Sequence, residues 1–169
     1  MKRKITALLS VLAITGGVLS GCAAPKEEVK EEAKETEKTE ATETATEVSY
    51  KDGVYKAAYK EFDERGWKSQ IEIEIKDGKI ATVAYDSLNK DGKSKKEDAE
   101  YKTNMEAKTK TYPEKYSQEL NDKLVEVQDV SKVDTVSGAT GSTEEFKALA
   151  KAALEAATKG DTNLVEIAR

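Results

Sequence analysis

The clearest structural signal in the chain is the stretch 71–80, Ile-Glu-Ile-Glu-Ile-Lys-Asp-Gly-Lys-Ile. Its isoleucines occupy every second position and alternate with charged residues, as in a β-strand with one buried face. The dipeptide Asp77-Gly78 favours the two-residue turn of a β-hairpin, so we predict that residues 79–85 return as the next strand. In that register Ile75 is expected to face Ile80, and Ile73 to face Thr82.

The segments on either side of this hairpin predict a single α+β domain. Residues 54–62 alternate as a further strand, which completes an antiparallel meander or half-barrel with one apolar face to cover. Apolar residues at helical spacing predict helices at 97–110, at 113–127 and from Ser142 to the residue before Gly160. Strands followed by helices indicate helices packed on one side of the sheet. Residues 130–136 and 164–168 are candidates for short additional strands.

Residues 1–21 are expected to be a lipoprotein signal peptide. Lys2-Arg3-Lys4 precedes an apolar segment, Ile5 to Val18, that is short for a membrane span. Leu19-Ser20-Gly21-Cys22 resembles the bacterial lipobox, and this resemblance implies cleavage before Cys22 and diacylation of its sulfur. Two acyl chains give stable anchoring, so we expect the mature protein on the outer face of the cell membrane, held by lipid.

Residues 22–49 are expected to be the lipidated cysteine and a disordered tether. From residue 26 onward the segment is almost entirely Glu, Lys, Thr and Ala, without an aromatic residue, and cannot form a core. A flexible chain of this length averages roughly 30 Å end to end. Residues 50–169 then remain as one domain with a modest core.

Composition excludes several kinds of chemistry. The chain has no histidine and a single cysteine, which removes His-based triads, thiol catalysis and the commoner zinc sites. It has neither a Gly-x-Gly-x-x-Gly nor a Walker pattern, so a mononucleotide- or dinucleotide-binding fold is unsupported. It has no dominant basic patch, so nucleic acid is not an expected partner. The segment 86–92 is better explained as a polar turn than as a calcium loop. We assign no catalytic residue and no metal ligand, although a carboxylate-pair hydrolase stays open.

The segment 134–140, Asp-Thr-Val-Ser-Gly-Ala-Thr, is the most informative for function. Ser142 followed by Glu145 forms a capping-box pattern, so we expect a helix to begin there, with the Thr140 hydroxyl just ahead of its N-terminus. The backbone N–H groups at such an end, including those of Gly141 and Ser142, favour a phosphate. A turn of small residues also lets a phosphate approach the backbone closely.

This segment resembles the flavinylation signature of the FMN-binding domain family: Asp, two arbitrary residues, Ser or Thr, Gly, Ala and Thr. Members include the covalent-flavin subunits of Na+-translocating NADH:quinone reductases and of Rnf complexes, and extracellular electron-transfer lipoproteins of Gram-positive bacteria. The resemblance implies an FMN cofactor joined to Thr140 by a phosphoester, and an FAD-dependent flavin transferase as the partner for maturation. The residues that the transferase would recognise are Asp134, Ser137, Gly138 and Ala139.

An isoalloxazine ring needs apolar or aromatic walls and a few hydrogen-bond donors. Trp67, the only tryptophan, is the first candidate, with Arg65 and Gly66 beside it in a turn between strands. Core packing is the alternative for each aromatic residue. Weaker candidates are Tyr59, Tyr85 and Tyr101 for the ring, and Asn89, Lys90 and Lys93 for the phosphate or ribityl chain.

Two functions are compatible with these observations. The first is a non-enzymatic electron carrier that accepts electrons from membrane quinone-linked redox proteins and passes them to other flavoproteins or extracellular acceptors. A chain poor in catalytic groups suits a protein whose chemistry comes from a cofactor. The second is a non-redox surface lipoprotein, either a binding module with a degenerate flavin fold or a pheromone precursor with its peptide at residues 14–21.

Overall fold

The computed structural model describes residues 49–169. The predicted signal peptide at 1–21, the predicted lipidation of Cys22 and the predicted tether up to residue 48 lie outside the described residues. The meander is built by β1 (Gly53–Tyr59), β2 (Lys68–Lys76) and β3 (Lys79–Leu88), with each neighbouring pair antiparallel, as predicted.

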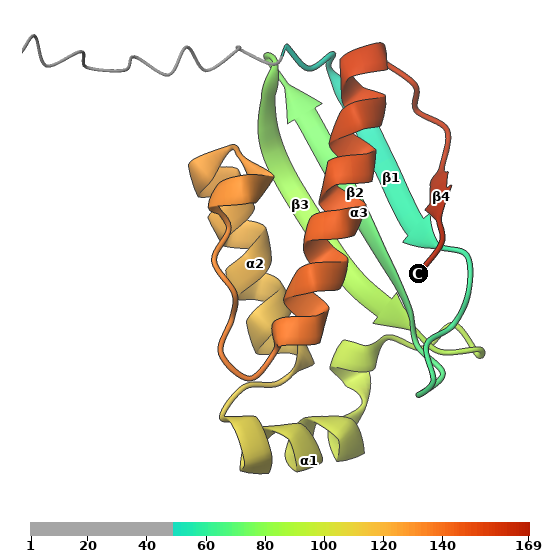
Figure 1. Ribbon diagram of the computed structural model, residues 1–169, viewed down its shortest axis with the longest axis vertical. Helices are drawn as coiled ribbons and strands as arrows, with labels where there is room; N and C mark the ends of the chain where they lie inside the picture. The colour runs from blue at the N-terminus through green and yellow to red at the C-terminus, as the bar shows by residue number, and fades with distance from the viewer. Residues whose placement is uncertain (1–48) are drawn as a thin grey trace, which may run out of the picture. The chain divides into compact units, whose positions relative to one another are not determined.

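A fourth strand makes the sheet mixed, so the prediction of a purely antiparallel sheet is wrong. β4 (Val165–Ile167) pairs in parallel with β1, and the strand order is β3-β2-β1-β4. Figure 1 shows why: α3 (Thr140–Lys159) returns the chain to the end of the sheet where β1 begins, so β4 runs in the same direction as β1. Residues 130–136 do not form a strand, because they begin with a short 3-10 helix, η2 (Val130–Lys132).

The hairpin forms at the predicted place, but its register changes within the strands. Both turn residues have positive φ, 53° at Asp77 and 72° at Gly78, which matches the twist of a tight hairpin. Ile75 pairs with Ile80 as predicted, whereas Ile73 pairs with Val83 and not with Thr82. A β-bulge opposite Glu74 and Ile75 inserts Ala81 as an extra residue.

This bulge turns the buried residues in the second half of β3 towards the core. After it, the residues opposite the buried face of β2 are Val83, Tyr85 and Ser87, and the last two are buried. Without the extra residue, strict alternation from Ile80 would turn Thr82 inward and expose Tyr85. The apolar pattern of β3 therefore requires the bulge.

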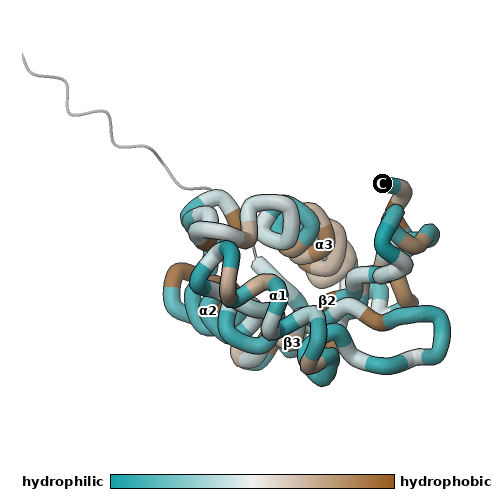
Figure 2. Tube along the Cα trace, turned by 90° about the horizontal axis from the view of Figure 1, so that it is seen from below, coloured by the Kyte–Doolittle hydropathy of each residue, from teal (hydrophilic) through white to brown (hydrophobic). Residues whose placement is uncertain are grey.

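Two helices cover one face of the sheet, which confirms the α+β prediction. α2 (Pro113–Val127) packs on β3, and α3 packs on β1 and β2 (Figure 1). The apolar face predicted for α3 is buried from Phe146 to Ala157, and the helix ends before Gly160, whose φ of 73° gives the left-handed cap. In Figure 2, α3 carries more hydrophobic chain than α1 (Ala99–Thr109), which contributes no fully buried residue. α1 and the short 3-10 helix η1 (Lys95–Glu97) lie at the end of the sheet where α3 begins (Figure 1).

Candidate functional site

The site is built on the turn that leads into α3. The Ala139 N–H donates to the Val136 carbonyl over 2.9 Å, which closes a four-residue turn with Ser137 and Gly138 at its centre. Gly138 has φ of 80°, the left-handed conformation that a type II turn requires at this position. Ser137 and Gly138 are exposed, while Ala139 is buried against the core.

α3 begins at Thr140, and its N-cap lies three residues before Ser142, the N-cap that the capping-box pattern predicts. Ala139 is the N-cap and no side chain caps this end of the helix. Ser142 lies inside the first turn, and the Glu145 carboxylate accepts hydrogen bonds from Ser69 and Tyr85 instead of reaching back to a cap. The predicted capping box is therefore wrong, because Glu145 is drawn to partners on the sheet that local sequence does not show.

The early start places Thr140 in the helix rather than ahead of it. Its side chain is exposed, and the first backbone hydrogen bond of the helix runs from the Thr143 N–H to the Ala139 carbonyl. The N–H groups of Thr140, Gly141 and Ser142 thus precede that bond, at the positive end of a 20-residue helix. An exposed hydroxyl beside such N–H groups is suited to carry a phosphate.

Thr143, which is not among the residues predicted from the sequence, fixes this turn to the helix. Its buried Oγ1 accepts a hydrogen bond from the Val136 N–H at 3.2 Å and donates one to the Ala139 carbonyl at 3.0 Å. The hydroxyl therefore satisfies the backbone on both sides of Ser137-Gly138. A Thr three residues after Thr140 is the sequence signal that would have found it.

α1 closes against Gly138 so tightly that only glycine fits. A Cβ built on Gly138 would lie 2.6 Å from Thr109 Cβ and 2.9 Å from the Thr109 carbonyl oxygen. Gly138 and the last turn of α1 border a cavity of about 430 Å³, a size typical of small-ligand sites. Its lining residues are Arg65, Tyr101, Asn104, Met105, Lys108, Thr109 and Gly138.

The charged residues that line this cavity are all positive. Arg65 and Lys108 line it and no carboxylate does, although the whole chain has a net charge of −5. The cavity therefore favours an anionic ligand over a cationic one.

Trp67 lies behind the cavity wall rather than in it. The Asp63 carboxylate accepts hydrogen bonds from the Arg65 and Trp67 N–H groups, and this turn holds the indole so that Trp67 is only 7% exposed. The Trp67 and Tyr101 rings meet edge to face with centroids 6.0 Å apart. Tyr101 is thus the aromatic residue that faces the cavity, and Trp67 supports it.

Several predicted ligand residues lie elsewhere. Asp134 is exposed and lines a different cavity, of about 390 Å³, between α2 and the segment before the turn. Tyr59 and Tyr85 belong to the core, and Tyr85 packs edge to face on Phe146. The Asn89 side chain accepts hydrogen bonds from the N–H groups of Asp91 and Lys93, which makes 89–93 a polar turn. Neither Lys90 nor Lys93 lines the cavity beside Gly138.

Two buried tyrosines, Tyr116 and Tyr85, have raised pKa values and stay neutral at physiological pH. Burial raises the pKa of Tyr116 to about 12, and the neighbouring Ser142 hydroxyl only partly opposes it. Burial also raises the pKa of Tyr85, despite its hydrogen-bonding contact with Ser69. Tyr116 and Tyr85 therefore serve as structural hydroxyls and not as bases.

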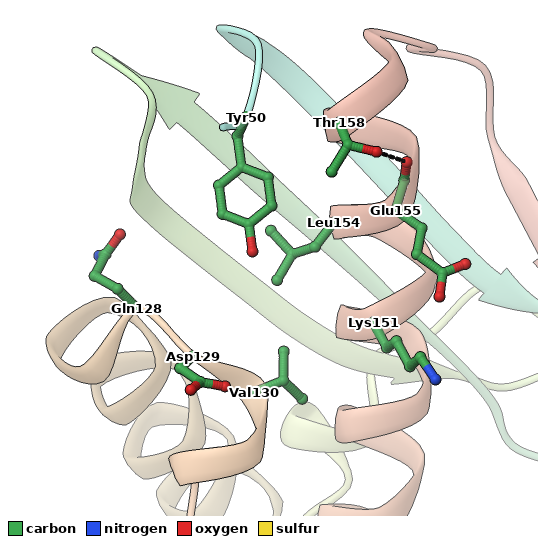
Figure 3. Close-up of a pocket in the computed structure, with 8 residues that line it drawn as sticks. All are labelled: Tyr50, Gln128, Asp129, Val130, Lys151, Leu154, Glu155 and Thr158. Atoms are coloured by element: carbon green, nitrogen blue, oxygen red, sulfur yellow. Dashed lines mark hydrogen bonds between the residues drawn. The ribbon is translucent and has the colours of Figure 1, made fainter. Parts of the chain in front are cut away.

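A further cavity lies along the later turns of α3, away from Thr140. It measures about 400 Å³, and Figure 3 shows Tyr50 and Leu154 at its apolar side, with Asp129 and Lys151 nearby. Both signs of charge occur around it, so it lacks the one-sided character of the cavity beside Gly138. Among residues 49–169, no cluster of acidic residues could hold a metal ion. No helix in this same range is long and apolar enough to cross a membrane.

Comparison with known proteins identifies the family. Residues 66–155 match the FMN-binding domain family, which covers more than half of the 169 residues, and the chain belongs to that family. The match includes Trp67, the turn at Gly138 and Thr140.

Two relatives extend this result. The chain is 39% identical over 117 residues to the 15 kDa lipoprotein of Treponema pallidum (strain Nichols), a match that covers 69% of this chain and 83% of that protein. It is also similar to the crystal structure of the CPE2226 protein from Clostridium perfringens, at 31% identity and a TM-score of 0.69. That match covers 71% of this chain and 98% of the other.

The residues around Gly138 and Thr140 fit the FMN that the family implies. Thr140 offers an exposed hydroxyl at an uncapped helix end, and Gly138 leaves no space for a side chain where the turn meets α1. The adjoining cavity supplies an aromatic residue, Tyr101, for a planar ring, and two cationic residues, Arg65 and Lys108, that favour the negative charge which the ring gains on reduction. These features lie together only because α1 and the β1–β2 turn reach the start of α3.

Proposed function

We propose that this chain carries FMN on Thr140 through a phosphoester and acts as an electron carrier. The observation that carries the proposal is the exposed Thr140 in the first turn of an uncapped 20-residue helix, two residues after Gly138, which borders a cavity that no carboxylate lines. Family membership supplies the identity of the cofactor. Bound FMN would supply exchange of one or two electrons, chemistry that side chains lack.

Attachment requires a flavin transferase, because an isolated Thr hydroxyl is a weak nucleophile. The Thr140 Oγ forms a bond to the FMN phosphorus of FAD, the pyrophosphate bond breaks, AMP leaves, and the hydroxyl proton passes to a base of the transferase. Thr143 holds the turn in place, and the unbonded N–H groups at the start of α3 stabilise the phosphate charge. The exposure of Thr140 suits modification by a second protein.

We propose further that the domain is held at the outer face of the membrane through lipid on Cys22. The lipobox pattern in the sequence and the printed name of the Treponema relative support a lipoprotein. The partners would be a membrane quinone-linked redox protein as donor and another flavoprotein or an extracellular acceptor. A covalent cofactor suits that position, because a dissociated flavin would diffuse away.

Production with and without a flavin transferase tests the attachment. We expect the tryptic peptide 133–147 to gain the mass of FMN less one water, and the intact protein to show in-gel flavin fluorescence. Thr140→Ala should lose both signals, whereas Thr135→Ala, an exposed Thr at an arbitrary position of the signature, should keep them. Unmodified wild type would support the non-redox binding module instead.

Electron transfer is tested on the loaded protein. Chemically reduced wild type should pass electrons to ferric iron or soluble flavin, followed as recovery of the oxidised flavin absorbance. Thr140→Ala taken through the same steps should give no such signal. Loaded wild type that stays reduced with every acceptor would contradict the carrier role while leaving the attachment intact.

A further inference from the structure

A buried lysine lies directly behind the cavity. Lys95, in η1, is only 7% exposed, which is rare for lysine. Its Nζ lies 4.5 Å from the Tyr101 ring centroid and 5.4 Å from that of Trp67, both within the range of cation–π attraction. The two rings therefore hold one ammonium group between them.

Aromatic rings stabilise the ammonium charge of Lys95, and no carboxylate of residues 49–169 forms an ion pair with it. Within residues 49–169, none of the ion pairs of 4.0 Å or less involves Lys95. A carboxylate partner would neutralise the field of the ammonium group, whereas aromatic faces stabilise it and leave its net charge in place. Because Tyr101 both contacts Lys95 and lines the cavity, the charge lies one side chain away from any ligand there.

We propose that Lys95 is a positioning residue whose charge, fixed between Trp67 and Tyr101, raises the reduction potential of a flavin in this cavity. The inference rests on the proposed function. Reduction adds negative charge to the ring system, and a positive charge fixed in a partly desolvated site favours that state more than a charge in water does. Arg65 and Lys108 at the cavity wall also favour the reduced flavin, but both side chains are exposed, so water and salt weaken the effect of their charges.

The central test is the potential of the loaded protein in three variants. Lys95→Met keeps the length of the side chain and removes the charge, Lys95→Arg keeps the charge, and Lys60→Met removes a charge from an exposed position. In equilibrium with a reference dye, Lys95→Met should lower the equilibrium constant for reduction roughly tenfold, which is about 30 mV for a two-electron couple. Lys95→Arg and Lys60→Met should stay within twofold of wild type.

An equal shift in Lys95→Met and Lys60→Met would overturn the proposal, because the effect would then be one of net charge. An unchanged potential in loaded Lys95→Met would overturn it as well. Wild type that acquires no flavin would refute the proposed function itself, and this result is distinguishable by the mass of peptide 133–147.

The aromatic cage is tested without any flavin. In unmodified protein, brief acylation of lysine amines followed by peptide mass analysis should modify Lys95 at least tenfold more slowly than the exposed Lys60. Tyr101→Leu should raise the rate at Lys95 and leave Lys60 unchanged. Equal rates at Lys95 and Lys60 in wild type would show that the rings do not enclose this ammonium group.

Discussion

Replacing Gly138 by Ala should disrupt the site through backbone geometry alone. The residue has φ of 80°, and an L-residue with a Cβ adopts this left-handed conformation at a cost of about 1–2 kcal/mol. The new Cβ would also lie 2.6 Å from Thr109 Cβ and 2.9 Å from the Thr109 carbonyl oxygen. Forcing α1 and the turn apart adds about 1–3 kcal/mol, so we expect Gly138→Ala to lower the free energy of unfolding by about 2–5 kcal/mol.

The chain provides a matched control three residues away. Gly141 lies in the first turn of α3, and a Cβ built on it has no atom within 4 Å. Because alanine favours a helix more than glycine does, Gly141→Ala should keep or raise stability by up to about 1 kcal/mol. Urea unfolding followed by the fluorescence of Trp67, the only tryptophan, measures both variants. A Gly138→Ala protein within about 0.5 kcal/mol of wild type, the usual effect of a surface substitution, would refute the packing argument.

Three further substitutions test other parts of the structure. Thr143→Val keeps the shape of the side chain but leaves the Val136 N–H without its hydrogen-bond acceptor. Urea unfolding should therefore show a free energy of unfolding lower by about 1–3 kcal/mol, and flavin occupancy should fall. An unchanged free energy of unfolding and unchanged occupancy would mean that this hydroxyl does not hold the turn. Burial raises the pKa of Tyr116 from 10.0 to about 12, so the stabilisation that comes from its neutral hydroxyl is complete below pH 10 and is lost as the pH rises towards 12. Tyr116→Phe removes the titrating hydroxyl, so the fall in the free energy of unfolding over this pH range should be about 3 kcal/mol smaller than in wild type. Parallel curves of the free energy of unfolding against pH for wild type and variant would contradict this. Asp134→Ala, at an exposed position, should lower flavin attachment by a transferase without changing stability, and unchanged occupancy would remove Asp134 from the recognition signal.

The fold was largely predictable because its signals are local and regular. Alternating isoleucines specify β2, Asp77-Gly78 specifies the hairpin, and Pro113 marks the first residue of α2. The errors arise where a distant partner decides the outcome. The bulge at Ala81 is needed only because Tyr85 must reach the core, and the parallel pairing of β4 depends on where α3 ends.

The candidate site was predictable at its centre and not at its walls. Thr140 could be singled out because the turn and the helix start lie next to each other in the sequence. The walls come from Arg65, Tyr101 and Lys108, which are 30 to 80 residues earlier and carry no motif. Lys95 is the strongest case, since a lysine in a charged segment is usually a solvent-exposed one. Its burial becomes visible only in the folded structure, where its ammonium group lies over the rings of Trp67 and Tyr101, and these two aromatic residues are 28 positions before it and 6 after it in the sequence.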